Sequence, residues 1–585
     1  MRILLLPLAL ALVPALSAQA SRPAGGTPCF REEGALLGVG SVPSKRVLWA
    51  DFDGDGFPDL LLDRKRVFLN RPGPKKGERL FREVPGAIPE KLKAWRGIAL
   101  PGDVNGDGKL DLYWGVYCDF RKPKVEKGRI VLDSRGRPVP AVKDDGRRSC
   151  ILLGDGKGRF RILKESGVEE PPATVCAAAF LDYDKDGVLD LFVGNWYKAY
   201  GVSLECYSDR LYKGLGGGRF KDVTKEAGML TDPRPGTHRS SKPTYGAATV
   251  DWNNDGWTDI LVCVYGRQWN MLWRNNGDGT FTEVGAETGW DGDRIRDGRY
   301  PEIVRIRLHR PDEKPFRANG NTFDVSVGDI DNDGDMDLFS GEITHWWAGP
   351  SSDLSMFLIN LGKEGGWKFQ RRPDLLPPRR HGRTWNQGDI HTALFDYDDD
   401  GWLDLVIASS DYPDDQFLRL YRNLEGKGFR EVTKEAGIRW RSPAGISLSD
   451  LDGDGRLDLV CGRSHMRLTK EQRKESPLAT GIWRNRCGKG NHWLELRLYG
   501  AGKGKANPCA VGARITARAG RKQWIREIQG GAGHAGHAND FLVHFGLGRV
   551  ERLDSLEILW PDRAGSRTIL KNLAVDRRLD IRQDR

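Results

Sequence analysis

Short runs of apolar residues, separated by polar turns rich in aspartate and glycine, recur along most of the chain. The runs Leu60–Leu62, Leu191–Val193, Ile260–Val262 and Leu405–Ile407 each follow such a turn directly. Apolar runs of this length, bounded by turn residues, are typical of buried β-strands rather than of helices. The pattern therefore predicts an all-β protein.

A second element follows many of these runs and completes a repeating unit. Leu420-Tyr421-Arg422-Asn423 leads through a glycine-containing turn to Phe429-Arg430-Glu431-Val432, and Leu211-Tyr212-Lys213 leads to Phe220-Lys221-Asp222-Val223. Each unit thus contains a strand, an Asp-rich loop, a second strand, a third strand and a fourth strand. Seven such units predict a seven-bladed β-propeller, in which ring closure removes exposed strand edges.

The Asp-rich loop has the pattern Asp-x-(Asp/Asn)-x-Asp-Gly-x-x-Asp and occurs seven times. Carboxylates at positions 1, 3 and 5 of a tight loop converge on one point, and glycine at position 6 permits the sharp turn. The carbonyl of position 7 and the carboxylate of position 9 can complete an oxygen cage suited to Ca²⁺, whereas all-oxygen ligands disfavour zinc. We predict up to seven structural calcium sites, with the ligands Asp51, Asp53, Asp55, Phe57, Asp59, Asp103, Asn105, Asp107, Lys109, Asp111, Asp182, Asp184, Asp186, Val188, Asp190, Asp251, Asn253, Asp255, Trp257, Asp259, Asp329, Asp331, Asp333, Asp335, Asp337, Asp396, Asp398, Asp400, Trp402, Asp404, Asp450, Asp452, Asp454, Arg456 and Asp458.

These loops resemble a known repeat family. They are not EF-hands, because position 12 is never acidic, whereas an EF-hand needs glutamate there. The loops and the trailing elements resemble the FG-GAP/VCBS repeats also found in integrin alpha-chain propellers, over roughly residues 35–487. This resemblance implies calcium bound between the strands of each blade.

After Asn491 the Asp-loop pattern stops and apolar residues alternate with polar ones, which predicts a small β-rich, sandwich-like domain. Gly512–Ile515, His544–Gly548 and Trp560-Pro561 resemble the ASPIC/UnbV domain. One departure is the glycine-rich turn Gly533–Asn539, where that family usually has an aromatic residue and a Ser-Gln pair. The combination is similar to secreted proteins related to cartilage acidic protein.

The chain divides into a signal peptide at 1–20, the propeller at 21–487 and the ASPIC/UnbV-like domain at 488–585. A cationic start, a short apolar stretch and Ser17-Ala18-Gln19-Ala20 are typical of a cleaved secretory signal. The apolar stretch is shorter than the roughly 20 residues that span a bilayer. We therefore expect a secreted protein, extracellular or periplasmic, without a transmembrane segment.

Export permits disulfides, and the chain has 9 cysteines. Cys118 with Cys150 would close the base of an insertion, and Cys487 with Cys509 would join the two predicted domains. Spacing alone does not determine the connectivity. No C-x-x-C pair occurs, so a thiolate zinc site has little support.

The chain as a whole has only a small excess of basic residues, but one segment is strongly basic. The chain has 91 Lys+Arg against 81 Asp+Glu, and its mean hydropathy of −0.53 excludes a polytopic membrane protein. The insertion 121–148 concentrates ten basic residues against four acidic ones. Outside the cell an acidic polysaccharide suits such a segment better than nucleic acid does, and an extracellular protein is the other partner we expect.

The recurrence of the loops in every unit, rather than in one cleft, favours a non-catalytic adhesion or recognition scaffold. No nucleophile elbow, P-loop or HExxH motif occurs. Because propellers host many chemistries, the alternative is a carbohydrate-active or hydrolytic enzyme with its site in the funnel near His345, Trp346, Trp385 and His391. A further candidate cluster contains His534, His537 and His544. These residues could bind a transition metal or transfer protons, but we expect a structural or surface role.

Overall fold

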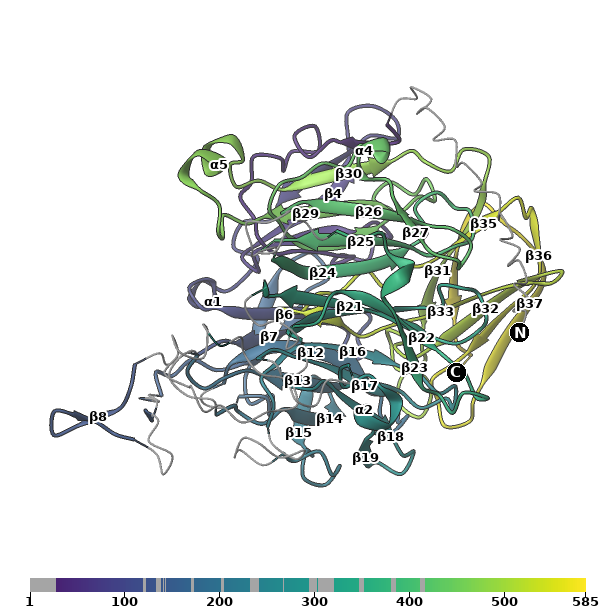
Figure 1. Cartoon of the computed structure of the whole chain (residues 1–585). Helices are drawn as coiled ribbons and strands as arrows, with labels where there is room; N and C mark the ends of the chain where they lie inside the picture. Colours follow the sequence, from purple (N-terminus) through teal and green to yellow (C-terminus); the bar gives the residue numbers. More distant parts are fainter. Residues whose placement is uncertain are drawn as a thin grey trace, which may run out of the picture.

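The computed structural model describes residues 28–118, 122–132, 138–139, 141, 144–169, 173–200, 205–231, 241–266, 268–293, 302, 320–346, 352–379, 386–410 and 416–584. Strands dominate these residues, which confirms the all-β fold (Figure 1). Among the described residues no helix is long and apolar enough to cross a membrane. The predicted signal peptide lies outside the described residues.

Seven four-stranded antiparallel groups, here called repeat sheets 1 to 7, follow one another in the described chain. Sheets 1 and 2 contain β2 (Val47–Ala50), β3 (Asp59–Leu62), β4 (Arg66–Pro72) and β5 (Arg79–Glu83), then β6 (Gly97–Gly102), β7 (Asp111–Val116), β10 (Cys150–Gly154) and β11 (Phe160–Leu163). Sheets 3 and 4 contain β12 (Val175–Leu181), β13 (Asp190–Asn195), β14 (Arg210–Gly216) and β15 (Arg219–Asp222), then β16 (Thr244–Val250), β17 (Asp259–Val264), β18 (Met271–Asn275) and β19 (Phe281–Glu283).

Sheets 5 to 7 repeat the same order. They contain β20 (Thr322–Gly328), β21 (Asp337–Thr344), β22 (Met356–Asn360) and β23 (Phe369–Arg372), then β24 (Gln387–Phe395), β25 (Asp404–Ser409), β26 (Leu418–Asn423) and β27 (Phe429–Glu431), then β28 (Pro443–Ser449), β29 (Asp458–Arg463), β30 (Gly481–Asn485) and β1 (Phe30–Glu32). The connections carry the short elements α1 (Glu90–Lys93), β8 (Val125–Glu126), β9 (Arg129–Ile130), α2 (Gly285–Thr288), the 3-10 turn Pro373–Leu375, α4 (Thr433–Ala436) and α5 (Lys470–Glu475).

Burial within each repeat sheet explains its sequence pattern. Strands β12, β13, β28 and β29 are buried at every residue, and strands buried on both faces appear as continuous apolar runs. The fourth strands β15 and β27 bury only their phenylalanines, Phe220 and Phe429. The Phe-x-(Glu/Asp) element is therefore an outer strand with one side chain packed inward.

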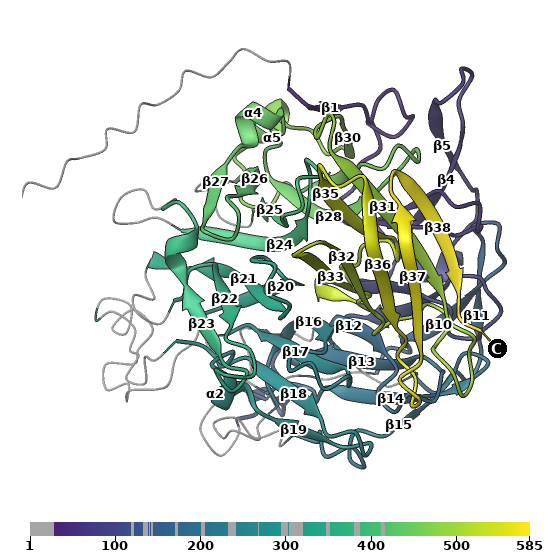
Figure 2. The same ribbon diagram turned by 90° about the vertical axis from the view of Figure 1, so that its right-hand side faces the viewer.

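The first strands of successive sheets pack against one another: β6 against β12, β12 against β16, β16 against β20, β20 against β24, β24 against β28, and β28 against β2. Sheets 5 and 6 are also hydrogen-bonded directly, between β21 and β24. Sheet 7 thus contacts sheet 1, and the repeat sheets curl about a common centre (Figure 2).

The N-terminal strand β1 completes sheet 7 by pairing with β30, with Phe30 opposite Asn485. This register places Cys29 beside Cys487, and the two form a disulfide across 458 residues of chain. The suggested pairs Cys118–Cys150 and Cys487–Cys509 are wrong. Cys118, Cys150 and Cys509 are buried free thiols. Cys509 is left unpaired because the pairing of β1 with β30 gives Cys487 another partner.

Two further sheets form the C-terminal domain. One contains β35 (Val543–Gly548), β31 (His492–Tyr499) and β38 (Arg577–Arg582), with β38 parallel to β31. The other contains β33 (Lys522–Glu527), β32 (Arg514–Ala519), β36 (Arg552–Leu559) and β37 (Arg567–Ala574). Leu494, Phe545 and Ile558 belong to a core that continues into repeat sheets 1 to 3. In Figure 2 these yellow strands lie over one side of the curled sheets.

Between β33 and β35 the chain leaves the C-terminal domain and enters the centre of the repeat sheets. We call residues 530–540 the finger. Its strand β34 (Ala532–His534) pairs with β16 of sheet 4, and Gly530 bridges to Phe180 of sheet 3. The Ala538 carbonyl accepts a hydrogen bond from Ser447 Oγ of sheet 7 at 3.0 Å. The finger therefore links sheets that lie far apart in the sequence.

Glycines let the finger approach the first strands so closely. A Cβ at Gly530 would lie 1.9 Å from the Phe180 carbonyl oxygen, and one at Gly533 would lie 1.5 Å from Asp324 Oδ1. Gly533 also has a φ of 99°, which L-residues with a side chain rarely adopt. The glycine-rich turn is therefore required by backbone contact.

Reduction of the Cys29–Cys487 disulfide is expected to lower the free energy of unfolding by about 2–4 kcal/mol, because the crosslink restricts the unfolded chain. Thermal melting with and without dithiothreitol measures this effect. The double variant Cys29→Ser/Cys487→Ser serves as the control and should melt at one temperature regardless of reductant. Equal melting of oxidised and reduced protein would contradict a stabilising role for this closure.

Candidate metal-binding loops and a buried histidine cluster

Each predicted Asp loop joins the first and second strands of a repeat sheet. Position 9 is the first residue of the second strand in every sheet, from Asp59 in β3 to Asp458 in β29. The loops thus occupy equivalent places in the seven repeat sheets.

The carboxylate at position 1 organises the loop backbone. In all seven loops it accepts a hydrogen bond from the N–H of the glycine at position 6, at 2.7–3.1 Å. That glycine has a φ between 81° and 105°, which only glycine adopts without strain. The geometry of the loop backbone therefore explains the aspartate at position 1 and the glycine at position 6 without a bound ion.

The carboxylate at position 9 clamps the loop to the sheet. In sheet 6, Asp404 accepts hydrogen bonds from the N–H groups of Tyr397 at 3.1 Å and Asn423 at 2.7 Å. The equivalent pair of bonds forms in the other six sheets. Burial raises the pKa of Asp59 to about 8 and that of Asp111 to about 7. These acids remain ionised more readily beside a positive charge.

Position 3 provides an acceptor without a donor. One carboxylate oxygen of Asp53, Asp184, Asp331, Asp398 and Asp452 is buried and makes no hydrogen bond. In sheets 1, 3 and 6 an oxygen from position 3 lies within 4.8 Å of oxygens from positions 1 and 9. In sheet 5 the position 3 oxygen lies within the same distance of oxygens from positions 1 and 5. A buried acceptor without a donor, close to the oxygens of other carboxylates, fits a bound cation.

Positions 5 and 7 shape the rest of the loop. The N–H of position 7 donates to the position 5 carboxylate in all seven loops. In sheets 2 and 4 position 3 is asparagine: Asn105 Oδ1 accepts the N–H of Asp107 at 2.9 Å, and Asn253 Nδ2 donates to Asp255 at 2.8 Å. These two loops have no orphaned oxygen at position 3 among the described atoms.

A basic residue on the third strand, which sequence analysis missed, lies beside four of the loops. Arg71, Lys213, Arg422 and Arg484 pair with the position 3 carboxylates of sheets 1, 3, 6 and 7. The sequence contains this basic residue in the element that follows the second strand, for example Arg422 before Asn423 in Leu-Tyr-Arg-Asn. Each of these loops contains at least four carboxylates. They outnumber the basic side chains of the same sheet that pair with them.

The asparagine of the same element connects neighbouring sheets. Asn423 Nδ2 of sheet 6 donates to the carbonyl of Ile330, position 2 of the loop in sheet 5, at 2.8 Å. Four further asparagines make the same bond at 2.8 Å to the preceding sheet: Asn70, Asn275, Asn360 and Asn485. The bond from Asn70 reaches Leu451 of sheet 7, so it also joins the first sheet to the last.

The C-terminal domain covers the loops with basic side chains. Arg497 lies 3.7 Å from Asp51, and Arg578 lies 3.2 Å from Asp450. Arg514 donates to the Gly334 carbonyl at 2.7 Å. A cavity of about 820 Å³ remains between this domain and the loops of sheets 1 to 3, which leaves space for hydrated ions.

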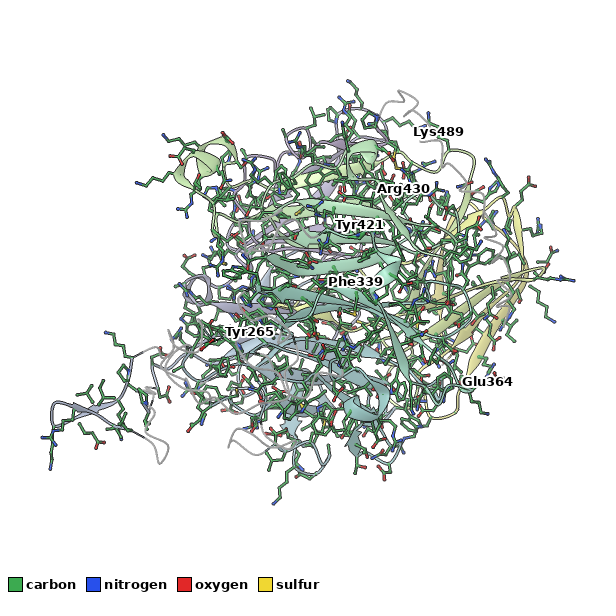
Figure 3. All side chains as sticks on the ribbon, in the orientation of Figure 1. Tyr265, Phe339, Glu364, Tyr421, Arg430 and Lys489 are labelled. Carbon is green, nitrogen blue, oxygen red and sulfur yellow. A yellow bond between two sulfur atoms is a disulfide. The ribbon has the colours of Figure 1, made fainter. Side chains whose placement is uncertain are left out.

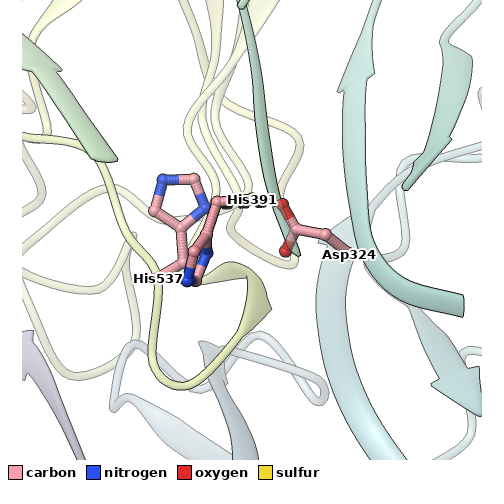
Figure 4. A group of neighbouring side chains, drawn as sticks. All are labelled: Asp324, His391 and His537. Carbon is pink, nitrogen blue, oxygen red and sulfur yellow. Dashed lines mark ion pairs between the residues drawn. The ribbon is translucent and has the colours of Figure 1, made fainter. Parts of the chain in front are cut away.

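Asp324, His391 and His537 form a buried cluster where the finger meets sheets 5 and 6 (Figure 4). Asp324 Oδ2 lies 3.9 Å from His537 Nδ1, and the ring centroids of His391 and His537 are 5.2 Å apart. Burial lowers the pKa of His537 to about 4 and that of His391 well below its ordinary value. Burial also raises the pKa of Asp324 to about 8.

The three histidines that the sequence singled out in the C-terminal domain do not form one cluster. His544 Nε2 lies 3.2 Å from Asp399, whose carboxylate outweighs the effect of burial and raises the pKa of His544 to about 9. His534 stacks on Tyr245 at 4.2 Å. Of the three imidazole rings, that of His537 lies beside the Asp324 carboxylate. His391, which packs against His537, was assigned by the sequence to a different group, the alternative enzyme site.

The described residues of the alternative enzyme site each contact different partners. His345 Nδ1 is hydrogen-bonded to Asn321 at 3.0 Å, and Trp346 is 44% exposed. His391 instead packs against His534 and His537. Trp385 lies outside the described residues.

Family comparisons support the sequence resemblance. The FG-GAP-like repeat model matches residues 51–114, 251–300 and 396–461, and the ASPIC and UnbV model matches residues 502–585. Cartilage acidic protein 1 of Homo sapiens is 22% identical over 526 residues, covering 80% of this chain and 68% of the relative. The Xenopus tropicalis protein is 26% identical, with 80% and 70% covered. The family models thus confirm FG-GAP-like repeats followed by an ASPIC/UnbV domain. Over most of its length the chain is similar to cartilage acidic protein 1.

Solved structures give weaker similarities. An Agrocybe aegerita protein described as recognising terminal N-acetylglucosamine has a TM-score of 0.37 at 14% identity, covering 78% of this chain and 98% of its own. An exotype rhamnogalacturonan lyase has a TM-score of 0.37 at 14% identity, covering 76% and 72%. At these scores neither protein informs the function of this chain.

Replacement of Asn423 by alanine is expected to lower the free energy of unfolding by about 1–3 kcal/mol, because the Ile330 carbonyl loses its donor in a buried place. Denaturant unfolding measures the change. Asn276→Ala, on an exposed turn one residue after the equivalent Asn275, is the matched control and should change stability little. Equal effects of the two substitutions would contradict a role for the inter-sheet bond.

Proposed function

We propose that this protein is a secreted, calcium-stabilised, seven-bladed β-propeller that acts as a non-catalytic recognition scaffold. The observation that carries the proposal is the orphaned position 3 oxygen, which recurs in five loops among buried carboxylates. Calcium takes six to eight oxygen ligands, and extracellular modules commonly bind it at roughly 0.1–1 mM. The Asp loops would supply such ligands from positions 1, 3, 5, 7 and 9.

The concentration of negative charge supports a bound cation most strongly in the Asp loop of sheet 5. Its loop contains Asp329, Asp331, Asp333, Asp335 and Asp337, and its third-strand position next to Asn360 holds Ile359 rather than a basic residue. Burial, together with the neighbouring carboxylates, raises the pKa of Asp331 to about 6. Buried carboxylates without compensation are unfavourable, and a divalent cation would relieve them.

The position of the loops supports a structural role for the metal. They recur in every repeat sheet, and the C-terminal domain covers them through Arg497, Arg514 and Arg578. A catalytic metal, in contrast, keeps an open coordination position in a unique site. Calcium would therefore stiffen the scaffold, and recognition would use surfaces away from the loops.

The hairpin β8–β9 supports a polyanionic partner. It projects from the body of the protein (Figure 1), and Figure 3 shows its side chains extending into solvent. Lys122, Lys124, Lys127 and Arg129 lie on or beside it, with Val125 58% exposed. An acidic polysaccharide would contact several of these cations at once, and salt would screen the interaction.

Removal of calcium with excess EDTA is expected to lower the melting temperature, because each site adds about 2.7 kcal/mol at a hundredfold excess over its Kd. Asp331→Asn should reduce the number of bound calcium ions by one in equilibrium dialysis. Asp335→Asn is the matched control in the same loop, because its predicted ligand is the backbone carbonyl. An unchanged melting temperature in EDTA would contradict the proposal.

Substitution of Lys122, Lys124, Lys127 and Arg129 by serine is expected to reduce retention on an immobilised uronic-acid polysaccharide, and added salt should reduce retention of the unmodified protein in parallel. A control of equal charge change replaces Lys470, Arg473, Lys474 and Lys489 by serine on other exposed segments. Equal losses in both variants would show a non-specific charge effect. Turnover of a glycan or ester substrate that His391→Ala abolishes would instead favour the enzyme alternative.

A further inference from the structure

Imidazole groups at the centre of the molecule are poorly hydrogen-bonded. Nδ1 of His391 is buried without a partner. The His537 ring makes no hydrogen bond of normal geometry, and the nearby backbone of Ala532 and Ile446 only partly offsets the effect of burial on its pKa. The side chains of His537 and Asp324 are 1% and 0% exposed. Buried polar atoms are nearly always hydrogen-bonded, and leaving them unpaired is costly. The unpartnered His391 Nδ1 and the His537 imidazole, both close to one buried carboxylate, therefore point to a ligand site.

The backbone brings these groups together at equivalent places of neighbouring sheets. Asp324 and His391 each follow a register shift at the start of a first strand, between Thr322 and Asp324 in β20 and between Asp389 and His391 in β24. Such bulges redirect a side chain. The corresponding shifts in sheets 3, 4 and 7 precede the non-ligating residues Ala177, Gly246 and Ile446. Of the five sheets with such a register shift, only sheets 5 and 6 place after it a residue whose side chain can bind a metal.

The carboxylate of Asp324 is held in place by the finger and by sheet 6. One oxygen accepts the N–H of His534 at 2.7 Å, and the other accepts the N–H of Thr392 at 2.6 Å. Outer-shell hydrogen bonds of this kind orient the ligands of metal sites. The close approach of the finger depends on Gly533, where a Cβ would collide with this carboxylate.

A cavity of about 30 Å³ adjoins the cluster and is lined by His391, His537, Arg46 and Arg64. This volume accommodates a water molecule. Nε and Nη1 of Arg64 are also buried without a partner. Two guanidinium groups beside a divalent ion would favour hydroxide or another small anion in the cavity.

We propose that Asp324, His391 and His537 bind one divalent transition-metal ion of the zinc class, with water or hydroxide from the cavity as a fourth ligand. One donor atom from each residue lies within 4.8 Å of the other two. Two imidazoles and a carboxylate suit Zn²⁺, whereas Ca²⁺ and Mg²⁺ prefer oxygen alone. Because His537 belongs to the finger and the other ligands to sheets 5 and 6, the ion joins the two domains.

Equilibrium dialysis of the calcium-saturated full chain against Zn²⁺, continued until binding is constant, tests the proposal. The result expected is one zinc ion per chain, with a higher melting temperature. His391→Gln and His537→Gln should each weaken zinc binding by at least about 100-fold, since even outer-shell changes cost 10- to 100-fold. His465→Gln is the control, because His465 bonds the Ser476 carbonyl outside the cluster.

Co²⁺ replacing Zn²⁺ in the unmodified protein provides a test that does not depend on the folding of a variant. A visible absorption spectrum of low-symmetry coordination and imidazole scattering in X-ray absorption would support the site. Failure of the unmodified chain to retain zinc in excess calcium would overturn the proposal. Zinc binding that survives both histidine substitutions but is lost in Asp331→Asn would assign the ion to an Asp loop and also overturn it.

Discussion

In every repeat sheet the second strand begins with a buried carboxylate, and this group holds the surrounding structure together. In sheet 6, Asp404 accepts one amide from its own loop and one from Asn423 of the third strand. The side chain of Asn423 then reaches the loop of sheet 5. A single acid thus fixes the loop, the sheet and, through asparagine, the junction with the neighbouring sheet. Burial makes the ionised form of this acid unfavourable, and the calcium that we propose would stabilise it.

The C-terminal domain also places positive charge beside the buried acids of the loops. Its arginines approach the loops of sheets 1 and 7, where Arg497 lies near Asp51 and Arg578 lies near Asp450. The finger simultaneously occupies the centre that the curled sheets enclose, through contacts such as Gly530 with Phe180. The domain therefore acts as part of the scaffold core rather than as an independent appendage, and its removal would expose both the acidic loops and the central strands.

The sequence predicted the repeating strands and loops, and it missed several contacts that occur once. The strand order and the loop positions followed from a pattern present in every unit, and glycine at position 6 followed from the turn that it must make. The Cys29–Cys487 disulfide, the finger and the pairing of His391 with His537 were not predictable, because each joins residues distant in sequence and appears in a single copy. Third-strand residues such as Arg422 and Asn423 were visible as a motif, but only the structure shows that one faces its own loop and the other the next sheet.

If the orphaned position 3 oxygens are calcium ligands, a crystal structure of the protein grown with calcium should reveal the ions by anomalous scattering. An anomalous peak is expected inside the loops of sheets 1, 3, 5, 6 and 7, with metal–oxygen distances of about 2.3–2.6 Å to positions 1, 3 and 5. Loops that contain only water at saturating calcium, with Asp331 hydrogen-bonded to that water, would contradict this expectation.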